Sequence, residues 1–295
     1  MPKAQVNGVD LCYDTVGDPA AHPLLLVHGY GAQLIQWPDG FCAALAGRGM
    51  FVIRFDNRDV GLSTKFDGVV PRIVPATTPG SYPGLDGPSA YTVRDMALDG
   101  IALFRHLGYP RAHVAGASLG GAIVQRMAID FPDALLSMTS IMARPGPGVG
   151  ESTAEATAAL LTPAPTERDA YAEHMAARAR IFQGAFHDPA AARRSAAASY
   201  DRCFYPQGRL RQLAAYIADG DRTAGLRSVR TPTMVVHGRD DPLVTPAGGE
   251  AVAAAVPGSV LRVFDGMGHD LPEPLWEQIA QAIADHAAKA IGSTM

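Results

Sequence analysis

Apolar residues in this chain gather into short continuous runs that are separated by longer segments of helical periodicity. Such runs are typical of strands in a parallel sheet, whose two faces are both covered. An Asn-Gly pair at residues 7–8 also indicates a hairpin turn between two short strands within residues 4–13. Together these patterns predict eight strands, namely the hairpin pair and residues 23–27, 51–55, 113–117, 135–142, 233–237 and 260–264.

The segments between the runs carry apolar residues at helical spacing. The clearest one begins with a capping pattern at Thr92–Asp95, ends near Gly108 and places on one face Val93, Met96, Ala97, Ile101, Phe104 and Leu107. Further helices are predicted at 38–48, 122–131, 248–256 and 275–290. This alternation favours a doubly wound, mostly parallel α/β sheet of eight strands covered on both faces. Residues 69–89, rich in Pro and Gly, are expected to form an irregular surface excursion.

The alternation is interrupted between residues 145 and 228. Helical pieces rich in Ala and Arg are predicted there, at 153–161, 166–182, 190–204 and 210–218. A helical insert between two strands of such a sheet would lie over the carboxyl edge of the sheet, where ligands bind. The chain is therefore divided into a first core part (1–144), a helical cap (145–228) inserted before the seventh strand, and a second core part (229–295).

Composition narrows the classes of function. A chain of 295 residues, 47% hydrophobic and 18% charged, can bury a large α/β core. Its formal net charge of −4 gives no reason to expect nucleic acid or an anionic membrane as a partner. The three cysteines lie far apart and predict neither a disulfide framework nor a metal site. With no apolar run for secretion or membrane spanning, we expect a soluble, cytoplasmic protein.

The run at 113–117 leads into Gly116-Ala-Ser118-Leu-Gly120, and a helical pattern follows directly. A strand, a sharp turn with serine at its tip and a helix start are typical of a nucleophile elbow. Glycine is needed because a Cβ at position 116 or 120 would collide with its neighbours in the strained turn. Ser118 is the candidate nucleophile, and an ordinary strand-to-helix turn is the alternative until its partners are found.

A serine nucleophile needs a base that is itself held by a third group, and in an elbow-type sheet the order along the chain is serine, acid, histidine. Of nine histidines, His269 fits this order best, in a loop after the last strand. The acid is expected after the strand at 233–237, in Gly238-Arg-Asp-Asp241-Pro242. Asp241, braced by the proline, is preferred to Asp240, which is expected to be an exposed turn residue.

Acyl transfer also needs hydrogen-bond donors where the oxyanion forms. The backbone N–H groups of Leu119 and Tyr30 are the candidates, because each follows the end of a predicted strand. Tyr30 lies in the loop His28-Gly-Tyr-Gly31, and His28 is expected to hold that loop rather than to react.

These motifs, together with Arg54-Phe-Asp-Asn-Arg-Asp-Val-Gly61 and Gly266-Met-Gly-His269, resemble the α/β-hydrolase superfamily over nearly the whole chain. The chain is most similar to bacterial lipase/esterases and to the aclacinomycin methylesterase type. The resemblance implies an α/β-hydrolase fold, a Ser118–Asp241–His269 triad, oxyanion amides at Tyr30 and Leu119, and no cofactor. The segment 54–63 is expected to be a charged turn that braces the oxyanion loop.

The sequence thus predicts a cofactor-free and metal-free hydrolase of small, apolar carboxylic esters. Thioesterases, lactonases, carbon–carbon bond hydrolases and cofactor-free perhydrolases use the same triad, and they stay open as alternatives. A ligand-sensing receptor with this fold is an alternative of another class. The sequence does not indicate an oligomeric state.

Substrate contacts are expected from Tyr30 and Trp37, which lie in or near the oxyanion loop, and from Phe182 and Phe204 in the cap. The cap aromatics can equally serve helix packing, as can Met175, Phe186, Tyr200 and Tyr205. The cap arginines 178, 180, 193 and 194 are expected to form a solvated face, with binding of an acidic substrate group as the alternative.

Overall fold

The computed structural model describes residues 1–74 and 84–292, and its main sheet has the eight strands that the sequence predicts. Their spatial order is β1-β2-β4-β3-β7-β8-β9-β10. β1 and β2 form the expected hairpin and β2 runs antiparallel to β4, whereas all other neighbours are parallel. The strands are β1 (Lys3–Val6), β2 (Val9–Val16), β3 (His22–Val27), β4 (Met50–Phe55), β7 (Ala112–Ala117), β8 (Leu135–Ile141), β9 (Thr233–Gly238) and β10 (Val260–Phe264).

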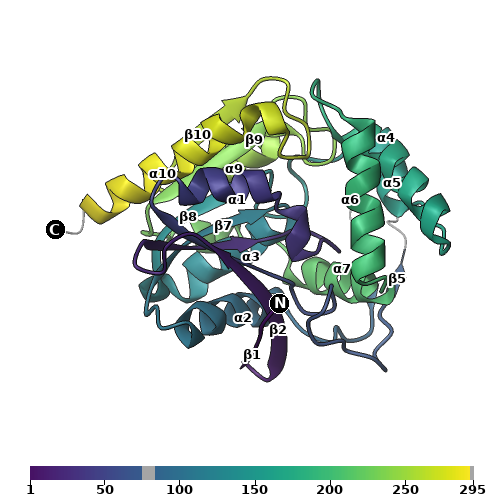
Figure 1. Ribbon diagram of the computed structural model, residues 1–295, viewed down its shortest axis with the longest axis horizontal. Helices are drawn as coiled ribbons and strands as arrows, with labels where there is room; N and C mark the ends of the chain where they lie inside the picture. Colours follow the sequence, from purple (N-terminus) through teal and green to yellow (C-terminus); the bar gives the residue numbers. More distant parts are fainter. Residues whose placement is uncertain (75–83, 293–295) are drawn as a thin grey trace.

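Helices cover both faces of this sheet, so the structure is doubly wound as predicted (Figure 1). One face buries apolar side chains of α2 (Val93–His106) and α3 (Leu119–Asp130), together with the end of α9 (Pro246–Ala255). The other face buries those of α1 (Asp39–Ala46) and α10 (Trp276–Gly292). β3, β4 and β7, in the middle of the sheet, have almost no exposed side chains, which explains their unbroken apolar runs.

Two local predictions differ from the structure. α3 begins at Leu119, immediately after Ser118, and not at 122, because the elbow turn leads directly into the helix. Within 69–89, expected to be irregular, β5 (Arg72–Val74) and β6 (Gly84–Asp86) pair as a short antiparallel ribbon. The density of Pro and Gly hid this pairing. Residues 75–83 of that prediction lie outside the described residues.

The helical insert lies between β8 and β9, and β9 is the seventh strand of the main sheet along the chain. It contains α4 (Ala154–Leu161), α5 (Arg168–Phe182), α6 (Pro189–Arg202), α7 (Gln207–Asp219) and the short α8 (Thr223–Leu226). In Figure 1, α4, α5 and α6 stand together beside the core while α7 reaches back toward it. The insert is confirmed, and its boundaries at 145 and 228 stay predictions. No described helix is long and apolar enough to cross a membrane.

Candidate active site

The candidate residues follow the carboxyl ends of parallel strands. Tyr30 follows β3, Ser118 follows β7, Asp241 follows β9 and His269 follows β10. Because the carboxyl ends of parallel strands meet at one edge of a sheet, residues far apart in the sequence are brought to the same edge.

Ser118 stands at the tip of a strained turn. Its backbone has φ 57° and ψ −118°, a conformation that costs a non-glycine residue roughly 1–3 kcal/mol. A Cβ on Gly120 would lie 1.9 Å from the carbonyl oxygen of Val27, and one on Gly116 would lie 2.1 Å from that of Gly120. The elbow therefore needs glycine at both positions, as the sequence predicts. No hydrogen bond of the Ser118 hydroxyl is found among the residues that the structure describes.

Asp241 and His269 are brought together. The Nδ1 atom of His269 lies 2.8 Å from Oδ2 of Asp241, whose side chain has no exposed surface. The other carboxylate oxygen accepts the backbone N–H groups of Leu243 and Val244, both at 2.9 Å. These bonds fix the carboxylate, which orients the imidazole through Nδ1 and does not contact Nε2. Asp240 is exposed, which agrees with the preference for Asp241.

A second histidine supports the acid, and the sequence did not indicate it. His237, at the end of β9, has Nε2 2.7 Å from the carbonyl oxygen of Val244 and 3.5 Å from Oδ2 of Asp241. Burial lowers the pKa of His237, so the ring is neutral and its Nε2–H donates to the carbonyl. The ring holds the turn that carries Asp241 without adding a charge.

The candidate oxyanion loop, residues 28–31, lies against the elbow. A Cβ on Gly29 would lie 3.5 Å from the Ser118 hydroxyl oxygen, so the backbone of this loop approaches the candidate nucleophile closely. The backbone N–H groups of Tyr30 and Leu119 donate to no other group within the described ranges. Buried amide donors normally find partners, so two free N–H groups beside the serine are suited to a developing negative charge.

His28 holds the oxyanion loop, as expected. Its Nδ1 accepts the backbone N–H of Gly29 at 2.7 Å, and its ring packs against Trp37 at a centroid distance of 4.9 Å. Burial lowers the pKa of His28 to about 4, with a smaller contribution from the neighbouring His269. The imidazole is therefore neutral at physiological pH.

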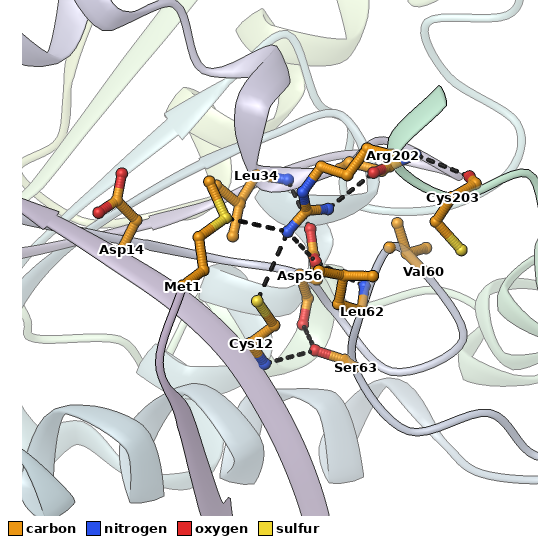
Figure 2. A network of polar contacts seen from close by, with 12 residues as sticks. Met1, Cys12, Asp14, Leu34, Asp56, Val60, Leu62, Ser63, Arg202 and Cys203 are labelled. Carbon is orange, nitrogen blue, oxygen red and sulfur yellow. Dashed lines mark hydrogen bonds and ion pairs between the residues drawn. The ribbon is translucent and has the colours of Figure 1, made fainter. Parts of the chain in front are cut away.

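The charged segment after β4 braces the loop. Asn57 donates to the carbonyl oxygen of His28 at 3.0 Å, and Asp56 accepts the backbone N–H of Leu34 at 2.7 Å. Arg202, at the end of α6, forms an ion pair of 2.8 Å with Asp56 and extends the brace to the cap. Figure 2 shows the Arg202 guanidinium between Asp56 and the sulfur atoms of Met1 and Cys12.

α7 holds the oxyanion loop from the side of the cap. The buried amide of Gln212 accepts the backbone N–H of Gly31 at 2.8 Å and donates to the carbonyl oxygen of Arg58 at 3.1 Å. Its neighbour Arg211 makes two hydrogen bonds to the buried Asp59, at 2.8 and 2.9 Å. Sequence reasoning missed both positions, because a polar residue on a predicted surface helix carries no signal for a distant loop.

The end of α5 pairs with the loop of His269. The backbone N–H of His269 donates to the carbonyl oxygen of Phe182 at 2.7 Å, and Ala185 donates to Gly266 at 2.9 Å. A Cβ on Gly268 would lie 2.3 Å from that Phe182 oxygen, so this approach requires glycine. The cap is thus joined by its backbone to the loop of the candidate base.

The predicted substrate contacts have different surroundings. Tyr30 is half-buried within the candidate oxyanion loop. Phe182 is also half-buried and adjoins the loop of His269. Trp37 is fully buried and stacks on Phe41, and it supports the loop from the core. Phe204 packs with Tyr171 and Tyr200 in an aromatic cluster between cap helices. Contact of these four residues with substrate stays a prediction.

One prediction about the cap arginines is wrong. Arg180 and Arg194 are exposed and Arg193 pairs with Glu173, as expected of a solvated face. Arg178 instead is half-buried over the ring of Phe182, because it lies one helical turn before that residue on the inner side of α5.

No group of three or more His, Cys, Asp or Glu side chains in the described part of the chain is placed to hold a metal ion. An open surface cavity of about 330 Å³ lies between Arg111, Pro132 and Arg230. These residues adjoin the amino ends of β7, β8 and β9, so this cavity is at the opposite edge of the sheet from Ser118.

Comparisons with known proteins agree with the fold. A family model described as alpha/beta hydrolase fold matches residues 22–273. Rhodomycin D methylesterase DauP of Streptomyces sp. (strain C5) is 28% identical over 317 residues, which cover 98% of this chain and 99% of that protein. The 3-oxoadipate enol-lactonase 2 of Acinetobacter baylyi is 26% identical and covers 87% of this chain and 85% of its own.

Solved structures share the same architecture. A meta-cleavage product hydrolase from Pseudomonas fluorescens IP01 superposes with a TM-score of 0.76 at 18% identity, covering 98% of both chains. An esterase from Thermogutta terrifontis superposes with a TM-score of 0.73 at 22% identity, covering 98% of this chain and 99% of that one. At these identities the likeness concerns the fold alone, and it agrees with the resemblance drawn from the motifs.

Proposed function

Since the chain belongs to the alpha/beta hydrolase fold family, we propose that it is a serine hydrolase that cleaves carboxylic esters through an acyl-enzyme on Ser118. The observation that carries the proposal is the hydrogen bond between His269 and the buried Asp241, at the sheet edge that bears the strained Ser118. The similarity to a methylesterase over 98% of the chain supports an ester as the substrate.

The proposed reaction has two half-cycles. In the first, Nε2 of His269 takes the Ser118 proton as the hydroxyl oxygen attacks the ester carbonyl. The resulting oxyanion accepts hydrogen bonds from the N–H groups of Tyr30 and Leu119. The intermediate then breaks its bond to the alkoxy oxygen, and His269 returns the proton to the departing alcohol.

In the second half-cycle, water replaces the alcohol. His269 deprotonates the water, the hydroxide attacks the acyl-enzyme, and Ser118 leaves with the proton as the carboxylic acid is released. Throughout, Asp241 keeps Nδ1 of the imidazole protonated and stabilises the imidazolium. Because the reaction needs only these groups and water, we propose no cofactor.

The nucleophile is tested by Ser118→Ala. We expect this variant to lose nearly all hydrolysis of short p-nitrophenyl esters, because no other group can form the acyl-enzyme. Initial rates measure the hydrolysis, and a burst that releases one equivalent of p-nitrophenol measures formation of the acyl-enzyme. A variant that retains the wild-type rate would show that the reaction occurs elsewhere.

The assignment of the acid is tested by a pair of neighbouring aspartates. Asp241→Asn should lower kcat by roughly 10²–10⁴-fold, because an amide cannot hold the imidazole in its reactive tautomer or stabilise its cation. Asp240→Asn, at an exposed position, is the matched control and should change kcat less than about twofold. Equal losses in both variants would remove Asp241 from the proposed triad.

A lactone is the second candidate substrate, because an enol-lactonase is among the similar proteins. Comparing kcat/KM for esters, thioesters and lactones of graded size separates these reactions, which share the acyl-enzyme. The predicted apolar character of the substrate and a cytoplasmic location belong to the same proposal.

A further inference from the structure

Two arginines of the cap lie beside the candidate site without an acidic partner. Arg178 on α5 and Arg209 on α7 are both half-buried. Within the described ranges neither forms an ion pair or a hydrogen bond, and each instead lies over an aromatic ring. The sequence of residues 75–83 contains no Asp or Glu that could pair with them.

Arg209 lies on the oxyanion loop. Its guanidinium carbon is 4.8 Å from the centroid of the Tyr30 ring. Its aliphatic stem covers Gly31, where an added Cβ would lie 2.7 Å from Cγ of Arg209. The charge of Arg209 is therefore held next to the loop whose Tyr30 N–H is proposed to bind the oxyanion.

Arg178 lies near the loop of His269, the candidate base. Its guanidinium carbon is 5.6 Å from the ring centroid of Phe182, whose carbonyl oxygen binds the backbone N–H of His269. Burial, followed by the charge of Arg209, lowers the pKa of Arg178 to about 10. Burial, followed by the charges of Arg178 and Arg209, lowers the pKa of His174, and its Nε2 is buried with no hydrogen-bond partner among the residues described.

This arrangement differs from the other buried arginines. Each of the buried arginines is paired with a carboxylate: Glu151 for Arg144, and an aspartate for Arg54, Arg58, Arg211 and Arg222. Two like charges that are partly removed from water and left unpaired destabilise the folded state unless a counter-charge binds between them. Guanidinium groups are well suited to that role, since they bind carboxylates through two parallel hydrogen bonds.

We propose that Arg178 and Arg209 form an anion subsite for a carboxylate of the substrate, with Nε2 of His174 at its edge. The inference rests on the proposed ester hydrolysis and specifies its substrate class. In place of the wholly apolar substrate that the sequence predicts, the preferred esters carry a second, ionised carboxyl group, which the cap holds while the ester carbonyl lies at Ser118. The aromatic rings under the two guanidinium groups contact the apolar part between the two ends.

The test compares methyl half-esters of straight-chain dicarboxylic acids, five to eight carbons long, with their neutral primary-amide counterparts. We expect the wild-type protein to favour the charged member of at least one pair in kcat/KM. In Arg178→Met and Arg209→Met, which keep an apolar stem, that preference should fall by roughly 10–100-fold, as expected for the loss of a charged hydrogen bond. Arg178→Lys should retain part of it, and the exposed Arg180→Met on the same helix should retain all of it.

A direct binding measurement separates this inference from the proposed reaction. Calorimetry with the Ser118→Ala protein should detect the binding of adipate. Adding Arg178→Met to this protein should weaken the binding, and adding Arg180→Met should leave it unchanged. If neutral esters are hydrolysed but no charged member is favoured and adipate does not bind, the anion subsite is wrong and the hydrolase proposal stands. If adipate binds through Arg178 while no ester is hydrolysed, the subsite stands and the proposed reaction fails.

Discussion

Asp270, next to the candidate base, carries a carboxyl group whose charge is poorly accommodated. Its Oδ1 is buried and has no hydrogen-bond partner among the described residues. Burial raises the pKa of this carboxyl from its usual 3.8 to about 6, although a backbone hydrogen bond and His269 partly oppose the rise. The folded protein therefore holds this proton at pH values where the unfolded chain has released it.

The stability of the protein should accordingly depend on pH through Asp270. Between about pH 4 and about pH 6, the unfolded state binds fewer protons at this carboxyl than the folded state does. The free energy of unfolding therefore falls as the pH rises through this range. Asp270→Asn removes this loss. The variant should gain roughly 1–3 kcal/mol relative to the wild type at pH 7, and little of that gain should be present near pH 4.

Urea unfolding at pH 4, 5, 6 and 7 measures the difference. The exposed Asp240→Asn is the control and should show no gain that grows with pH. A gain of Asp270→Asn that is the same at pH 4 and pH 7 would mean that the amide acts through packing and not through the proton.

At the scale of single residues, the sequence indicated the candidate reacting groups but not the residues that hold them in place. Ser118, Asp241 and His269 could be chosen because glycine spacing and chain order constrain a nucleophile turn and its partners. Gln212 and His237 could not be chosen. Gln212 bonds to residues that are distant in the sequence, and His237 bonds to a turn that folds back on it. Such contacts depend on tertiary packing, which leaves no local pattern.

At the scale of elements, α7 is the helix that fastens the cap to the core. Its Arg211 makes a bidentate pair with Asp59, and both side chains are almost completely buried. The brace at Arg202 and Asp56 does the same for the end of α6. Both aspartates lie in the segment after β4, so one short turn of the core receives both helices.

Breaking the pair at α7 should destabilise the protein strongly. Arg211→Met leaves the Asp59 carboxylate buried without its cation, which costs roughly 3–5 kcal/mol. Arg168→Met is the matched control, because its partner Asp201 is exposed and such pairs contribute at most about 1 kcal/mol. Urea unfolding of both variants gives the comparison, and similar losses would mean that the buried pair does not anchor α7.

Strands and helices themselves were predictable where their patterns are local. Continuous apolar runs identified β3, β4 and β7 because these strands are covered on both faces. The ribbon of β5 and β6 was missed, since its three-residue strands are too short for any periodicity to show. The inward position of Arg178 was missed for another reason: a predicted helix does not by itself reveal which face meets the core.

At the scale of the whole molecule, core and cap differ in what the sequence reveals. The order of strands and the glycine-bearing turns of the core follow general rules of α/β sheets, so they can be predicted from the sequence. The cap is a set of helices rich in Ala and Arg, whose mutual packing and approach to the sheet edge depend on long-range contacts. The fold was therefore predictable from the sequence, whereas the packing of the cap around the candidate site was not.

The hydrogen bond between the carbonyl oxygen of Phe182 and the backbone N–H of His269 couples the end of α5 to the loop of the candidate base. A displacement of the end of α5 away from this loop breaks the hydrogen bond to the backbone of His269. Displacing α5 and releasing the imidazole of His269 then share part of their free-energy cost. An interaction that stabilises the position of α5 therefore also stabilises the orientation of the imidazole. A ligand that draws α5 inward would make the base more rigid without touching it, so occupancy of the cap and reactivity at the edge would rise together.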